Sequence, residues 1–246
     1  MTGTTARPLA LIVALAVERR TLQSLLSRRH ESRVEDRRVV QGYRADQPVI
    51  LIQAGLGSDN ARAAARLVCR HFECRALWSV GVAGGLAPTL RPGQLVVPSA
   101  VFPETPGRVL PVTDSGGLKQ LEPHVARGRL LTLSRPLLTA GEKQAWHERT
   151  GAIAVDMEAA GVGEAAAELG LPWCAVKAIL DSADQTLPAF LAAGTSAEGD
   201  LTWSPLLSAL WSPARLRAAL GLGRATRVAL AALVAALAAL LDAGSP

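Results

Sequence analysis

Cysteine, lysine and aromatic residues are scarce in this chain of 246 residues. The three cysteines, Cys69, Cys74 and Cys174, show neither a CxxC pair nor zinc-ligand spacing, and their odd number argues against a disulfide framework. Free thiols fit a reducing compartment, so we expect a cytoplasmic protein. Aromatic residues make up 4% of the chain, which is too few for the base-stacking surface of a nucleic-acid-binding protein.

Positive charge is also poorly organised, although the formal net charge is +5. The densest basic stretch, 28–38, is interrupted by Glu31, Glu35 and Asp36. Mixed charge of this kind is typical of a solvated surface segment. We therefore expect no nucleic-acid partner.

Two apolar runs imitate membrane signals. Arg7 followed by 9–17 resembles a short signal peptide, but the run has the length of a strand and ends at Glu18 before a helical pattern, which favours a buried strand. The run 228–241 holds fourteen consecutive apolar residues, fewer than the roughly 18 to 20 that cross a bilayer. We expect neither segment to span a membrane.

Apolar strand-like runs alternate with alanine-rich helical stretches, the pattern of a sheet covered by helices. Predicted strands are 9–17, 48–54, 76–82, 94–101, 129–133 and 173–180. Predicted helices are 18–28, 59–71 with Ser58 or Asp59 as the cap, 157–169 ending at Gly170, and 213–241 with a break near Gly221 and Gly223. The Pro- and Gly-rich stretch 103–128 is given no regular structure. Because the alternation ends near residue 200, we predict a catalytic domain at 1–200 and a helical C-terminal extension at 201–246.

Glycine-rich or acidic segments stand at several predicted strand ends, where α/β folds place functional groups. Gly55-Leu56-Gly57 and the run 81–86 each follow an apolar strand. Such glycines allow close backbone approach to a ligand, although purely structural turns use them too. The first run lacks the third glycine of a dinucleotide-binding fingerprint.

Three carboxylates come from three such ends: Glu18, Glu158 and Asp181. An acidic residue at a helix start has an ordinary explanation in the helix dipole, and Asp184 can be a simple cap. Three carboxylates from separate elements exceed what capping requires. The pattern predicts a site that handles protons or developing positive charge.

These segments, in this order, resemble the purine nucleoside phosphorylase and nucleosidase superfamily, through the branch that includes methylthioadenosine/S-adenosylhomocysteine nucleosidase. The resemblance covers about 9–190 and rests on 14–18, 55–60, 80–86 with Pro92-Gly93, 154–158 and 179–184. It implies a three-layer α/β/α fold with a central mixed sheet, and a homo-oligomer. The tail and the run 181–188 look most like the hopanoid-associated phosphorylases, which are thought to remove adenine from adenosylhopane.

The resemblance also implies roles. Asp181 would protonate purine N7, and Glu18 would orient or deprotonate the attacking water. Glu158 would accept hydrogen bonds from the ribose hydroxyls, with Met157 against the sugar. The glycine-rich strand end would contribute the remaining substrate contacts, through Gly81, Val82, Ala83 and Gly84. It implies no metal and no organic cofactor, with phosphate as an alternative co-substrate.

Departures from the family pattern favour water over phosphate. Val82 stands where the family often has serine or threonine, Leu180 stands where a hydroxyl residue usually precedes the catalytic aspartate, and Lys177 replaces an arginine. No phosphate-site pattern is found near Arg19 and Arg20.

Two questions stay open at this stage. The first is the substrate, which is adenosylhopane or a smaller nucleoside such as methylthioadenosine, S-adenosylhomocysteine or futalosine. The alternative of another class is a catalytically idle binding or scaffold protein, which would not require the three carboxylates. The tail, with Arg215, Arg217, Arg224 and Arg227 before its apolar run, either packs on its own domain or docks on a membrane surface.

Overall fold

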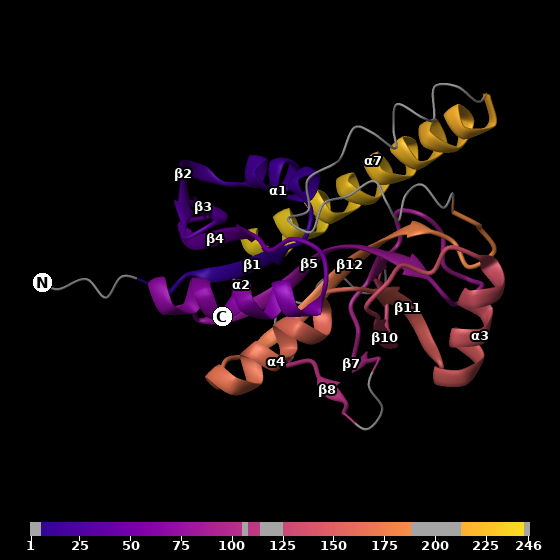
Figure 1. The fold of residues 1–246 in the computed structure, drawn as a ribbon. Helices are drawn as coiled ribbons and strands as arrows, with labels where there is room; N and C mark the ends of the chain where they lie inside the picture. The colour runs from indigo at the N-terminus through magenta and orange to yellow at the C-terminus, as the bar shows by residue number, and fades with distance from the viewer. Residues whose placement is uncertain (1–5, 105–107, 114–124, 188–212, 244–246) are drawn as a thin grey trace, which may run out of the picture.

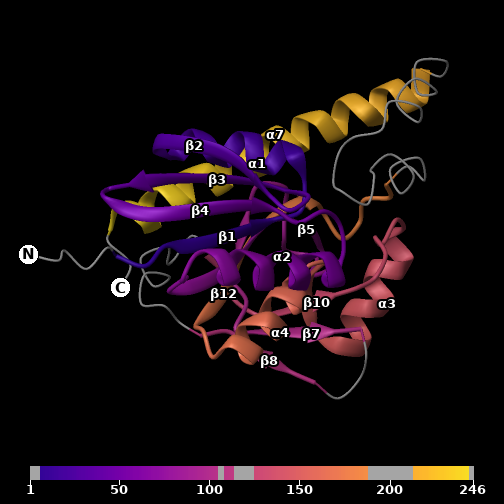
Figure 2. The same cartoon turned by 60° about the vertical axis from the view of Figure 1, so that its left-hand side comes forward.

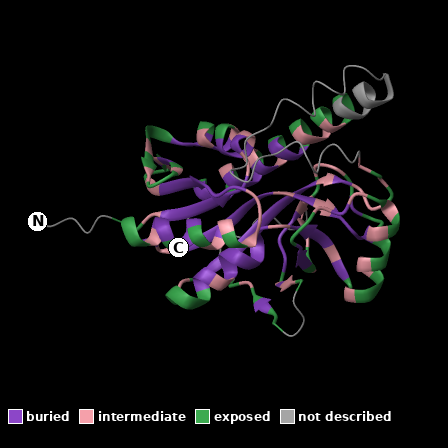
Figure 3. Ribbon diagram, in the orientation of Figure 1, coloured by how far each residue is buried: buried purple, intermediate pink, exposed green. Residues whose placement is uncertain are grey.

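The computed structural model describes residues 6–104, 108–113, 125–187 and 213–243. Its centre is four parallel strands in the order β4 (Gln47–Gln53), β1 (Leu9–Val13), β5 (Ala76–Gly85) and β12 (Trp173–Asp181). These strands are apolar along most of their length and buried on both faces, as parallel strands covered by helices must be (Figure 3). Their carboxyl ends lie at one edge of the sheet.

Antiparallel pairs make the sheet mixed, as predicted. On one side a hairpin of β2 (Ser27–Val34) and β3 (Arg37–Arg44) extends the sheet from β4. On the other, β11 (Ala152–Asp156) runs antiparallel to the end of β5 and continues to further strands. The remaining strands are short: β6 (Leu95–Val96), β7 (Ala100–Pro103), β8 (Leu110–Pro111), β9 (Val125–Ala126) and β10 (Arg129–Thr132).

Helices cover both faces and produce the three layers (Figures 1 and 2). One apolar cluster joins the sheet to α2 (Ser58–His71) and α4 (Ala159–Leu169). A second joins the opposite face to α7 (Pro213–Asp242) and to α1 (Ala16–Leu22), which continues into a 3₁₀ turn at Gln23–Leu25. α3 (Ala140–Thr150) contacts β11. The predicted fold class is confirmed.

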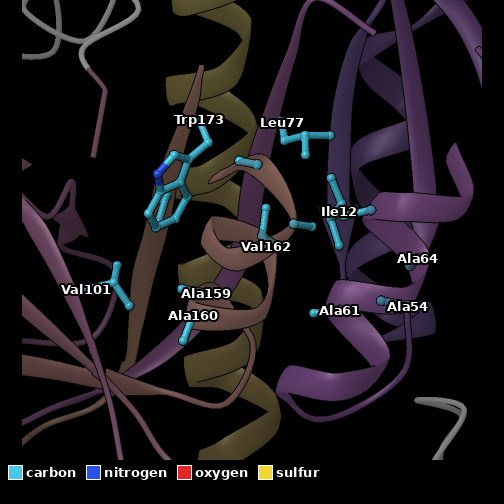
Figure 4. Packing of buried hydrophobic residues seen from close by; sticks show 14 of the residues in the cluster. Ile12, Ala54, Ala61, Ala64, Leu77, Val101, Ala159, Ala160, Val162 and Trp173 are labelled. Atoms are coloured by element: carbon cyan, nitrogen blue, oxygen red, sulfur yellow. The ribbon is translucent and has the colours of Figure 1, made fainter. Parts of the chain in front are cut away.

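Small residues bring α2 and α4 into very close contact (Figure 4). A Cβ at Gly161 would lie 1.9 Å from the carbonyl oxygen of Ser58, so no other residue fits there without moving a helix. Ala61, Ala64, Ala159 and Ala160 are fully buried in the same cluster. This contact fixes the first turn of α2 against the first turn of α4.

The second half of the C-terminal helix packs against the sheet, as one of the two alternatives for the tail predicts, whereas docking on a membrane stays a prediction. α7 runs unbroken through Gly221 and Gly223, contrary to the predicted break. Its second half buries a leucine stripe: Leu230, Leu233, Leu237, Leu240 and Leu241. Asp242 accepts a hydrogen bond from Arg44 Nε at 2.6 Å, which ties the helix end to β3.

Helix α7 is also long and apolar enough to cross a membrane by length and composition, over Leu220–Asp242 with a mean hydropathy of 1.8. The prediction that the segment does not span a membrane counted only the consecutive apolar run 228–241, and the helix extends beyond that run, so its length does not support that prediction. Packing against the sheet accounts for part of this hydrophobicity, since 39% of the 18-residue apolar window within the helix is buried inside the protein.

Several boundaries differ from the predictions. The first strand was predicted to reach residue 17, but β1 ends at Val13 because helix α1 already begins at Ala16. The N-cap of α2 is Gly57, which has no side chain to cap the helix, and not Ser58 or Asp59. β5 continues to Gly85, so the glycine run lies inside the strand rather than after it. The segment 94–101 contains parts of two strands, and β8 and β9 occupy the stretch given no regular structure.

Other elements were missed. The basic stretch 28–38 is exposed, as predicted, but it belongs to the β2–β3 hairpin, whose outer strand has no apolar face to mark it. α3 and β11 were also missed, since α3 has charged residues on most of its turns and β11 has five residues. The boundary predicted near residue 200 lies in 188–212, outside the described residues.

Candidate active site

A cavity of about 170 Å³ opens where the carboxyl ends of β5, β11 and β12 meet the first turns of α1 and α4. In open α/β sheets this edge is where ligands bind. The three predicted carboxylates all line it. The described lining is Ala14, Leu15, Glu18, Leu56, Val82, Ala83, Gly84, Arg135, Pro136, Leu137, Val155, Asp156, Met157, Glu158, Leu180, Asp181 and Leu187.

Glu18 is held between the first turn of α1 and strand β5. Its Oε2 accepts the backbone N–H groups of Ala14 at 3.1 Å and Leu15 at 2.9 Å, and its Oε1 accepts that of Val82 at 2.9 Å. Gly81 makes room for it, because a Cβ there would lie 2.6 Å from Oε1. Burial raises the pKa of Glu18 above its ordinary value, while the backbone donors counteract part of the rise.

Glu158 stands at the N-terminus of α4 but does not cap it. Its Oε1 accepts the N–H of Gly57 at 2.9 Å, across the close contact between α2 and α4. Asp156 performs the capping task instead, since its Oδ2 accepts the N–H of Ala159 at 2.9 Å. Burial and then the nearby Asp156 carboxylate raise the pKa of Glu158 to about 7.

A buried ion pair lies behind Glu158. Lys177 on β12 contacts Asp156 Oδ2 at 2.8 Å, and Thr132 donates to Asp156 Oδ1 at 2.6 Å. Burial opposes the charge of Lys177, yet the carboxylates of Asp156 and Glu158 raise the pKa of its ammonium group. This ammonium balances negative charge that would otherwise accumulate on one side of the cavity.

Asp181 is the last residue of β12 and is buried against α3. Lys143 of α3 donates to Asp181 Oδ2, and also to the carbonyl oxygens of Ser182 at 2.8 Å and Gln185 at 2.7 Å. Burial raises the pKa of Asp181, and the Lys143 charge counteracts the rise.

The rest of the lining is mainly apolar. Leu15, Leu56, Met157, Leu180 and Leu187 contribute side chains to it. Arg135 is the one cationic residue of the described lining, and its guanidinium donates to Glu142 Oε1 at 2.8 Å. Apolar walls around a few carboxylates fit an organic ligand with a polar head.

The structure thus brings together Glu18, Glu158, Asp181 and Met157 with the strand residues Val82, Ala83 and Gly84. Gly81 is placed beneath Glu18, outside the lining. Asp184 is exposed and accepts a hydrogen bond from Ser182, so it takes the ordinary structural role.

Sequence reasoning missed the site roles of Lys143, Asp156 and Leu56, and it noted Lys177 merely as a departure from a family pattern. One signal was available for the lysines. Among 26 basic residues three are lysine, and both lysines of the described chain are buried behind carboxylates.

Comparison with known proteins identifies the family of the chain. The sequence profile of the Phosphorylase superfamily matches residues 8–201, most of the chain and all of the cavity lining. The chain belongs to the Phosphorylase superfamily.

Several of the proteins that are similar to this chain carry the same name. A 5′-methylthioadenosine/S-adenosylhomocysteine nucleosidase from Mycobacterium bovis is 25% identical over 178 residues, covering 55% of this chain and 70% of its own. The corresponding enzyme from Neisseria meningitidis, solved with methylthio-immucillin-A, superposes with a TM-score of 0.75 at 17% identity, covering 96% of this chain and 99% of its own. A futalosine hydrolase from Helicobacter pylori superposes with a TM-score of 0.75 at 15% identity, covering 97% of this chain and 98% of its own.

Proposed function

We propose that this protein is a purine nucleoside N-glycosidase that releases adenine from a 5′-substituted adenosine. The observation that carries the proposal is the convergence of Glu18, Glu158 and Asp181 on one largely apolar cavity. Breaking an N-glycosidic bond creates a purine anion and an oxocarbenium-like sugar, so an enzyme must protonate the first and stabilise the second. A relative's nucleosidase activity agrees with this assignment.

Asp181 is the acid. Its burial favours the protonated form, and it delivers that proton to purine N7 as the C1′–N9 bond breaks and its electron pair moves to the base. The leaving group then departs as neutral adenine.

Glu158 binds the ribose. Its free lone pairs accept hydrogen bonds from the two ribose hydroxyls, while Gly57 N–H keeps the carboxylate in place. The negative charge then lies near the developing sugar cation, with Met157 against the ribose.

Water is the nucleophile. Its oxygen bonds to C1′ and its proton passes to Glu18, whose burial makes it a stronger base than an exposed carboxylate. Phosphate would meet the negative charge of Glu18, and the one cation of the described lining, Arg135, is already paired with Glu142. A phosphate dependence of base release would reverse this assignment.

The 5′ substituent is apolar, and adenosylhopane is the substrate that we propose. The leucine-rich part of the lining supports an apolar substituent, and the resemblance of 181–188 and the tail to the hopanoid-associated branch supports this lipid. Methylthioadenosine, S-adenosylhomocysteine and futalosine are the alternatives that the relatives' names supply.

A lipid substrate requires the enzyme to work at a membrane surface, and the first part of α7 suits that contact. Leu220 and Val228 are 65% and 46% exposed, with the arginines Arg224 and Arg227 between them. This part of α7 is linked to the strand that carries Asp181: a Cβ at Gly93 would lie 2.6 Å from Val228, and the N–H of Gly93 donates to the carbonyl oxygen of Ile179, two residues before Asp181.

The deciding experiment incubates the protein with each nucleoside, with and without phosphate, and measures free base by chromatography. We expect adenine release without phosphate, and faster release from vesicle-borne adenosylhopane than from methylthioadenosine. Replacing Arg224 and Arg227 by glutamate should slow the vesicle reaction selectively. If no nucleoside yields free base, the proposed function is wrong; if methylthioadenosine is the better substrate, the lipid assignment is wrong.

A further inference from the structure

Lys143 is a fully buried lysine on a helix whose other residues are intermediate or exposed. Burying an ammonium group without compensation is costly, so such a residue must be paired and hydrogen-bonded. All three of its N–H donors have acceptors: Asp181 Oδ2 and the carbonyl oxygens of Ser182 and Gln185. The side chain therefore ties α3 both to the carboxylate and to the loop that follows β12.

The choice of lysine is itself informative. The chain uses arginine for 23 of its 26 basic residues. An ammonium group is compact and directs three donors within a small space, whereas a planar guanidinium would not reach these three acceptors in the same volume. The space between α3 and the end of β12 therefore accommodates the ammonium group of lysine better than the guanidinium group of arginine.

We propose that Lys143 is the positioning residue of Asp181: it holds Oδ2 so that Oδ1 is presented to the base, and it stabilises the carboxylate that remains after proton transfer. The inference rests on the proposed acid role of Asp181. With Oδ2 bonded to the ammonium, Oδ1 is the oxygen left to carry the proton to N7. As that proton leaves, a buried negative charge forms, and the adjacent positive charge balances it without any rearrangement.

Other charged groups near Asp181 do not replace Lys143. The cavity also holds Glu18, Asp156, Glu158 and Arg135, and Asp184 lies on the following loop. The carboxylates have the wrong sign, Arg135 is paired with Glu142, and Lys177 contacts Asp156. Removal of Lys143 should therefore raise the pKa of Asp181, because the ammonium is what favours its ionised form.

The test compares Lys143→Gln and Lys143→Met with the control Gln144→Met, an exposed neighbour on the same helix. Glutamine keeps N–H donors for the loop carbonyls without the charge, so it separates charge from folding. We expect both Lys143 variants to lose about 100-fold in kcat with little change in KM. The alkaline limb of the pH profile should move up by about one unit or more, and the control should match the native protein. A loss of kcat with an unmoved limb would mean a structural role and overturn the proposal.

A double-mutant cycle gives an independent result, and Lys143→Gln takes the place of Lys143→Met in the cycle if the methionine variant does not fold. In the Asp181→Asn background no buried carboxylate remains to be balanced, so adding Lys143→Met should change kcat less than about threefold. Equal losses in both backgrounds would contradict the inference.

A titration separates this inference from the proposed function. Carboxyl NMR of the Asp181 side chain, in the native protein and in Lys143→Gln without substrate, should show a higher pKa in the variant. If the protein releases no base but the titration shifts, the function is wrong and the pairing stands. If base release occurs and the titration does not shift, the pairing alone is wrong.

Discussion

At the residue scale, the sequence predicted which carboxylates line the cavity, but it did not predict the lysine residues that pair with carboxylates there. Glu18, Glu158 and Asp181 were found because they follow strand ends, and parallel strands place those ends at one edge of a sheet. Lys143 was missed because α3 itself was missed, and it contacts Asp181 across 38 residues of sequence. No local pattern reports such a distant pair. The scarcity of lysine was the one usable sign.

Asp181→Asn should leave the fold intact and reduce base release by two or more orders of magnitude. The change removes the proton donor at nearly constant volume, and general acid catalysis contributes roughly 10²- to 10⁴-fold. Turnover by the purified variant measures it, with circular dichroism as the folding control. Near-native turnover in a folded variant would remove Asp181 from the acid role.

Glu158 should impose an acid limb near pH 7 on kcat/KM. The pKa of this carboxyl is raised to about 7, so it becomes protonated, and ceases to accept both ribose hydroxyls, as the pH falls below that value. Glu158→Gln should lower kcat as well as affinity and should lack this limb. If the acid limb of the pH profile persists in Glu158→Gln, the limb reports the titration of another group.

At the scale of elements, long apolar strands and regular helix stops were predicted well, as with β12 and the end of α4 at Gly170, which adopts the left-handed conformation with a φ of 65°. Short elements and charged elements were not predicted. β2 carries exposed residues on both sides, so neither the period of two nor an apolar run marks it.

The contact between α2 and α4 should be intolerant of any side chain at its centre. Gly161→Ala would place a methyl group 1.9 Å from Ser58 O, so the helices must separate. We expect a loss of about 3 kcal/mol in the free energy of unfolding, and a melting temperature lower by roughly 10 °C. Calorimetry can compare it with Gly223→Ala in α7, where nothing lies within 4 Å and the change should be neutral or mildly stabilising. Equal melting temperatures would show that the helices adapt freely.

At the scale of the whole molecule, the tail is part of the core, because α7 completes one face of the sheet. Leu233→Asn should therefore destabilise the protein strongly, by about 3 kcal/mol or more, whereas Ala235→Asn on the exposed side of the same helix should be well tolerated. Denaturant titration of both variants gives the comparison. Similar midpoints would mean that the helix packs too loosely to stabilise the sheet.

A homo-oligomer stays a prediction that follows from the family resemblance. Light scattering at the working concentration is expected to show at least a dimer. A fully active monomer would contradict it.

The charged hairpin has a consequence for how the protein behaves in concentrated solution. Among the described residues, β2 is the terminal strand of the sheet on its side, and it is eight residues long (Figure 2). A free edge of that length offers unpaired amide and carbonyl groups to the strands of other molecules and is a common origin of aggregation. Arg28, Arg29 and Arg33 stand along it. In a molecule that approached edge to edge, these three arginines, with Glu31 as the one acidic residue of the strand, would lie close to their copies, and we expect the net repulsion to disfavour such pairing.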